Sequence, residues 1–82
     1  MPTIHRYKGY RFFFFSNERN EPAHVHAEMG DSVAKFWLDE RIALASAYGF
    51  SGHELTEIAG IIHDNRASML RKWNEFFSQD RS

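Results

Sequence analysis

The stretch HVHAEMGDSVAKFWL, residues 24–38, has the pattern of a β-hairpin. Strand-forming residues flank Gly30-Asp31, and glycine in the first position of a two-residue turn favours type II′. Such a turn fixes the register, because a slip of one residue would move every side chain to the other face. The predicted register sorts the hairpin into an apolar face with Val25, Ala27, Ala34, Phe36 and Leu38, and a polar face with His24, His26, Glu28, Lys35 and Trp37.

An earlier hairpin is predicted from the runs Ile4 to Tyr7 and Tyr10 to Ser16, which flank Lys8-Gly9. Four consecutive phenylalanines, residues 12–15, show no alternation, so this strand should be inner and apolar on both faces. The same turn would set Arg6 directly opposite Arg11. Two like charges in that position repel unless an acid or a bound anion lies nearby.

The second half of the chain is predicted to be helical, after a further short strand around Ile42 and Leu44. Ser51 and Glu54 have the spacing of a capping box, so a helix should start at Ser51. An unbroken helix over residues 51–77 would be about 40 Å long, which exceeds the expected width of so small a domain. We therefore expect a kink or two helices meeting near Asn65, followed by a frayed tail over residues 78–82.

Composition indicates one small domain spanning residues 1–82, with a β-rich part over 1–46 and a helical part over 51–77. The 82 residues include no cysteine and carry a formal charge of -1, which leaves stability to packing and excludes thiol chemistry. No apolar run is long enough to span a bilayer, so we expect a cytoplasmic protein without membrane contact. The predicted class is α+β: an antiparallel sheet of about four or five strands, packed on one face by a C-terminal kinked helix or helix pair.

Several motifs resemble one small bacterial family, the domain of unknown function DUF4160. They are the opening Met1-Pro2-Thr3, the run Gly9 to Glu18 (GYRFFFFSNE), the block Glu21 to His26 (EPAHVH), the segment Ala34 to Asp39 (AKFWLD), Gly49-Phe50-Ser51 and the closing Trp73 to Phe77 (WNEFF). The resemblance implies no activity. It does imply a protein encoded beside another short protein, which suggests a toxin–antitoxin-like pair and a small protein partner from the neighbouring gene.

The polar hairpin face provides the main functional hypothesis, a metal-independent ribonuclease or an RNA-binding protein that needs no cofactor. On this hypothesis His24 and His26 would move protons during attack of a ribose 2′-hydroxyl on the adjacent phosphate, while Glu28 orients an imidazole. Lys35 and Arg11 would hold the phosphate and Trp37 would stack on a base. The basic residues of the first hairpin, Arg6, Lys8 and Arg11, could follow an RNA backbone.

Two other interpretations of the same face stay open. His24, His26 and Glu28 could form a three-ligand metal site, although Lys35 opposite His26 would repel a dication. Alternatively the face is an ordinary solvated sheet surface or a protein interface, covered by a partner or by a second copy in a homodimer.

Overall fold

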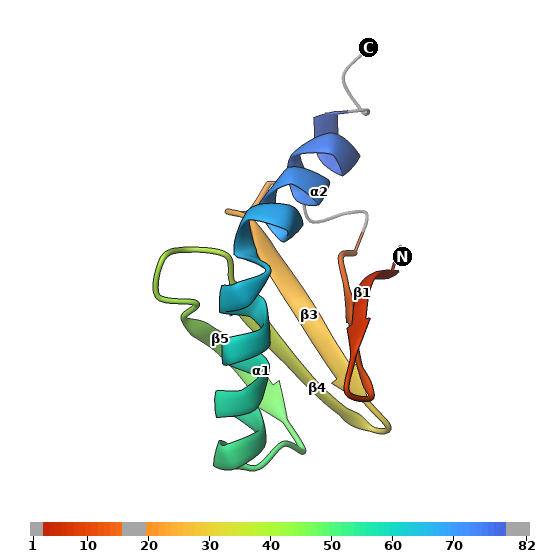
Figure 1. Cartoon of the computed structure of the whole chain (residues 1–82), viewed down its shortest axis with the longest axis vertical. Helices are drawn as coiled ribbons and strands as arrows, with labels where there is room; N and C mark the ends of the chain where they lie inside the picture. The colour runs from red at the N-terminus through yellow and green to blue at the C-terminus, as the bar shows by residue number, and fades with distance from the viewer. Residues whose placement is uncertain (1–2, 16–19, 79–82) are drawn as a thin grey trace.

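A computed structural model describes residues 3–15 and 20–78 of the chain. Five antiparallel strands form one sheet in the order β1-β2-β3-β4-β5, and two helices follow (Figure 1). This is the predicted α+β class. The elements are β1 (Thr3–Tyr7), β2 (Tyr10–Phe13), β3 (His24–Met29), β4 (Ser32–Trp37), β5 (Leu44–Tyr48), α1 (Gly52–Asp64) and α2 (Arg66–Ser78).

Both predicted hairpin turns are present. Gly30 has a φ of 59°, whereas Asp31 is not among the residues with positive φ, and this combination is that of a type II′ turn. Lys8 and Gly9 both have positive φ, as a type I′ turn requires. The β3–β4 register is the predicted one, with His24 opposite Trp37 and His26 opposite Lys35.

The last strand begins later than predicted, because a tight loop separates it from β4. Ile42 lies in this loop with a φ of 52°, and its side chain is buried, so it is not a strand residue. The carboxylate of Asp39 holds the loop by accepting hydrogen bonds from the backbone amides of Arg41 and Ala43, both at 3.1 Å. β5 therefore starts at Leu44 and forms one edge of the sheet.

The helical half begins as predicted. Ser51 is the N-cap of α1, its hydroxyl accepts from the amide of Glu54 at 3.1 Å, and the Glu54 carboxylate accepts from the amide of Ser51 at 2.8 Å. The helix also breaks at Asn65, whose side-chain amide donates to the carbonyl of Ile61 while its own carbonyl accepts from the amide of Met69. The domain is longer than expected. Its longest dimension is 42 Å, and the two helices follow one another along it (Figure 1).

The core lies between one face of the sheet and the two helices. Phe12 and Phe14 point into it, and Phe14 contacts the rings of Trp73, Phe76 and Phe77. Strand β2 ends at Phe13, earlier than the predicted end at Ser16. Ser16 itself lies outside the described residues. The predicted tail over 78–82 lies, apart from Ser78 at the end of α2, outside them as well. Neither helix is long and apolar enough to cross a membrane within the described ranges.

Candidate functional site

The sheet face opposite α1 and α2 carries two rows of side chains that cross the strands. We call the part of this face formed by these two rows the open face, because α1 and α2 pack on the other side of the sheet (Figure 1). The cross-strand registers define the first row as Arg6, Arg11, Glu28, Val33 and Tyr48, and the second as Phe13, His26, Lys35 and Ser46.

A shallow depression of about 160 Å³ lies on the open face over β3, β4 and β5. Its polar lining consists of an imidazole from His26, an ammonium from Lys35 and a hydroxyl each from Ser46 and Tyr48. Val33, Ala34 and Ala47 complete the lining. The depression therefore combines an ammonium, an imidazole and an aromatic ring with 73% of its residue surface exposed.

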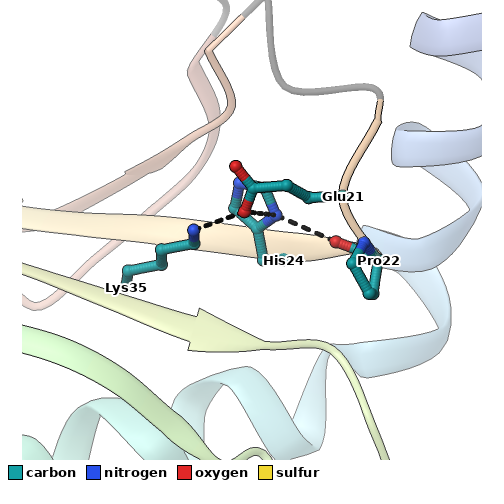
Figure 2. Close-up of polar contacts among 4 residues, drawn as sticks. All are labelled: Glu21, Pro22, His24 and Lys35. Carbon is teal, nitrogen blue, oxygen red and sulfur yellow. Dashed lines mark hydrogen bonds and ion pairs between the residues drawn. The ribbon is translucent and has the colours of Figure 1, made fainter.

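Lys35 is held at the rim of this depression by two contacts. Its Nζ atom donates to Oε1 of Glu21 at 2.6 Å (Figure 2). The same atom lies 4.7 Å from the centre of the Trp37 ring. Glu21 belongs to the segment that leads into β3, so its carboxylate reaches the sheet face from outside the sheet. Lys35, the cation predicted to bind phosphate, is thus already paired with the carboxylate of Glu21. Trp37, the residue predicted to stack on a base, lies beside Lys35 and is half-buried.

His24 does not lie on the exposed surface, and that part of the prediction is wrong. Its side chain is fully buried, with ring centres 4.9 Å from Trp73 of α2 and 5.6 Å from Trp37 of β4. Its Nδ1 lies 2.9 Å from the carbonyl oxygen of Pro22 and 4.0 Å from Oε1 of Glu21 (Figure 2). Since both neighbours accept hydrogen bonds, Nδ1 carries a proton. Packed against Trp73 of α2 and Trp37 of β4, this imidazole is closed to solvent and to substrates.

His26 is only half-buried and reaches the depression. Its ring stacks on Phe13 with centres 5.3 Å apart and meets the edge of Phe15 at 4.6 Å. These aromatic contacts fix the orientation of the imidazole. Of the two histidines predicted to work as a pair, one is therefore accessible from the open face and one is not.

Glu28 contacts a cation rather than either imidazole. Its Oε1 accepts from Nε of Arg11 at 2.9 Å, which supplies the acid that the Arg6–Arg11 register requires. Arg11 also donates to the hydroxyl of Thr3 and lies over the ring of Phe13. Within the described part of the chain, Glu28 thus serves Arg11, and this contact does not support its predicted role in orienting a histidine.

Lys8 does not lie beside Arg6 and Arg11 on the open face, where it was predicted to contribute to RNA binding; its ammonium contacts α1. It lies in the β1–β2 turn, and its Nζ is 3.8 Å from Oε2 of Glu57 on α1. Oε1 of the same carboxylate accepts from the Tyr10 hydroxyl at 2.8 Å. Burial, together with this hydrogen bond and the neighbouring negative charge, raises the pKa of Tyr10 to about 12. Arg6, Arg11 and Lys35 remain on the open face.

The alternative metal site is not assembled. Among residues 3–15 and 20–78, no group of three histidine, aspartate or glutamate side chains is arranged to hold a metal ion. Glu28 is engaged by Arg11, and His24 is buried under Trp73.

Sequence reasoning missed three residues around the depression. Ser46 and Tyr48 lie beyond the strand that is predicted around Ile42 and Leu44, so their register could not be assigned. Glu21 falls in a segment whose polar composition predicts an exposed loop. The sequence did contain one signal for Glu21: its carboxylate lies three residues before His24, and that spacing lets it reach the start of β3.

Comparisons with known proteins identify the relatives of this chain. A family model described as Domain of unknown function (DUF4160) matches residues 9–74, a range that holds β2 to β5, all of α1 and most of α2. Searches of curated proteins and of solved structures found no match. The matched segment covers well over half of the chain, and the protein belongs to the DUF4160 family.

Proposed function

We propose that this protein is a toxin–antitoxin-type protein whose open face binds single-stranded RNA at the depression beside Lys35. The observation that carries the proposal is the lining of that depression: an ammonium, an imidazole, two hydroxyls and an exposed ring lie together on a sheet. Proteins that bind single strands combine cations for the phosphates with aromatic rings on which bases stack.

The charge of the open face supports an anionic ligand. Among residues 3–15 and 20–78, Arg6, Arg11 and Lys35 outnumber the carboxylates that contact cations on this face, Glu21 and Glu28, by one charge. The whole chain carries a formal charge of -1, so the excess of positive charge is local. A local excess favours contact with phosphates without attraction over the rest of the surface.

Tyr48 is the residue best placed for stacking. It stands in the same row as Val33, and both are exposed, at 73% and 42%. An exposed ring beside an apolar side chain offers a base a flat surface, and one stacked base contributes about 1–3 kcal/mol. Trp37, the residue predicted for this role, is partly covered by Lys35.

Among the described residues, this face lacks the pair of accessible histidines that the predicted cleavage of RNA needs. Acid–base catalysis requires two groups that both reach the substrate. His24 is sealed beneath α2, which leaves His26 as the histidine at the depression. Ribonuclease activity would need a different second group.

The test is RNA binding measured by fluorescence anisotropy in the presence of a chelator. We expect Tyr48→Ala to weaken binding by about tenfold or more, the loss of one stacked base. Lys35→Gln should weaken binding and reduce the slope of log affinity against log salt by about 0.7. Arg71→Gln, which removes an exposed cation of α2, is the control and should leave affinity nearly unchanged. Equal affinities for all four proteins would contradict the proposal, and a gel of the same RNA would reveal cleavage.

A second candidate function is binding of a small protein partner, such as the product of a neighbouring gene. The exposed apolar side chains of Val33 and Tyr48 on the open face favour it. Co-expression of the two proteins tests this candidate, with Val33→Lys as the disrupting variant and Arg71→Gln as the control. Co-purification lost only with Val33→Lys would support it, and failure of the unmodified pair to co-purify would contradict it.

A further inference from the structure

Two hydroxyl-bearing residues of β5 share the open face, a small one and a large one. Ser46 lies directly opposite Lys35, and Tyr48 lies directly opposite Val33. Because Ser46 and Tyr48 are two residues apart on one strand, they point to the same side of the sheet and lie about 6–7 Å apart. Both residues are exposed and both line the depression, so a ligand there can contact the two together.

Ser46 lies between the exposed ring and the cation of this depression. The ammonium of Lys35 is directed away from Tyr48, because its Nζ lies 4.7 Å from the ring of Trp37, two residues further along β4. Tyr48 lies on the other side of Lys35, opposite Val33, which precedes Lys35 by two residues. Along the strand direction the order is therefore Tyr48, Ser46 and then the Lys35 ammonium.

This order matches the order of parts in a nucleotide. A base stacked on Tyr48 and a phosphate bound at Lys35 are joined through a sugar, which then lies over Ser46. The serine side chain is small, so a sugar can come close to the strand, and its hydroxyl both donates and accepts hydrogen bonds. The 2′-hydroxyl of ribose is likewise a donor and an acceptor, and it is the group that DNA lacks.

We propose that Ser46 gives the open face a preference for RNA over single-stranded DNA, through a hydrogen bond with the ribose 2′-hydroxyl. The inference rests on the RNA binding proposed above and adds the residue that recognises the sugar. The ring of Tyr48 stacks on any base and the ammonium of Lys35 attracts any phosphate, so these two contacts do not distinguish the sugars. The imidazole of His26 can also bind a hydroxyl, but it lies on β3, across Lys35 from β5.

A matched pair of ligands tests this assignment. Short labelled oligouridylate and oligodeoxyuridylate of equal length differ only in the 2′-hydroxyl, so fluorescence anisotropy with each one measures the contribution of that group. The unmodified protein should bind the RNA oligomer about two- to tenfold more tightly, the effect of one hydrogen bond. Ser46→Ala should bind the two oligomers equally, with its affinity for the DNA oligomer unchanged.

Two further variants separate recognition of the sugar from effects on folding. Ser46→Thr keeps a hydroxyl on β5 and should retain the preference for RNA. Ser68→Ala removes a hydroxyl from α2, on the other side of the sheet, and should behave as the unmodified protein does. Circular dichroism would verify that each variant is folded.

The outcomes distinguish this inference from the proposed function. Equal binding of the two oligomers by the unmodified protein, or a preference for RNA that survives in Ser46→Ala, would overturn the role of Ser46 and leave RNA binding in place. Failure of the unmodified protein to bind either oligomer would contradict the proposed function itself, and the role of Ser46 with it.

Discussion

The carboxylate of Glu21 lies 2.6 Å from the ammonium of Lys35, so an acidic residue of the chain occupies the position that a phosphate would take. Both side chains are partly exposed, and such pairs contribute less than about 1 kcal/mol to stability. A phosphate that binds Lys35 has to displace this carboxylate. Removal of the Glu21 carboxylate should therefore affect ligand binding more than the stability of the fold.

Glu21→Gln is expected to tighten RNA binding several-fold at low salt, because it removes a competing charge. Its free energy of unfolding should fall by less than about 1 kcal/mol. Anisotropy titrations and urea denaturation measure the two effects. Glu40→Gln removes an exposed charge from the loop after β4 and serves as the control. Equal tightening in both variants would assign the effect to overall charge rather than to the Glu21–Lys35 contact.

His24→Ala should destabilise the protein by about 2–4 kcal/mol. The substitution opens a cavity beside Trp73 and leaves the carbonyl of Pro22 without its donor. His53→Ala, at an exposed position near the start of α1, should change the free energy of unfolding by less than about 0.5 kcal/mol. Urea denaturation compares the two variants. A small loss for His24→Ala would contradict the burial of this side chain.

Ser51→Ala should cost about 1 kcal/mol, because it removes the side-chain acceptor that caps α1. Ser51→Asp keeps an acceptor at the N-cap and should retain most of the stability. Thermal denaturation of the two variants, followed by circular dichroism, distinguishes loss of the cap from a general intolerance of substitution at this position. Equal losses would speak against the capping box.

Gly49 and Gly60 should respond to alanine in opposite directions. Gly49 has a φ of 87°, and a Cβ there would lie 2.5 Å from the hydroxyl of Ser32, so Gly49→Ala should destabilise the turn after β5. Gly60 lies inside α1 with no atom near an added Cβ, so Gly60→Ala should stabilise by about 0.4–1 kcal/mol. Denaturant titrations test the opposite signs, and a shared sign would contradict the local geometry of one of the two sites.

Alkaline titration should reveal the buried phenol of Tyr10. Its pKa is about 12 in the folded protein, compared with 10.0 for an unperturbed tyrosine, so the folded state favours the neutral form. This contribution to stability is fully present below pH 10 and is lost as the pH rises towards 12, because the unfolded chain ionises first. Unfolding free energies measured across this range should decline less steeply for Tyr10→Phe. Identical pH profiles would contradict the raised pKa.

The elements with local signals could be predicted from sequence. Two-residue turns at Lys8-Gly9 and Gly30-Asp31 dictate their own registers, and the capping box at Ser51 depends on residues three apart. The places of His26, Glu28 and Lys35 on the open face followed from strand alternation once the β3–β4 register was known. These features need no information from distant parts of the chain.

The burial of His24 could not be predicted, because it depends on Trp73, forty-nine positions further along the chain. Alternation places His24 on the polar side of β3, yet α2 runs past the end of the sheet and covers it. The start of β5 was equally hidden, since it depends on a loop held by the side chain of Asp39. Both errors concern the points where the sheet ends and tertiary contacts take over.

Through His24, the last helix and the segment before β3 stabilise each other. The imidazole packs on Trp73 of α2 and, through Nδ1, holds the backbone at Pro22, next to the residue that neutralises Lys35. Any ligand that draws Glu21 away from Lys35 therefore acts on a segment anchored to the C-terminal helix. A ligand that displaces Glu21 is therefore expected to change amide exchange in α2, some distance from where it binds.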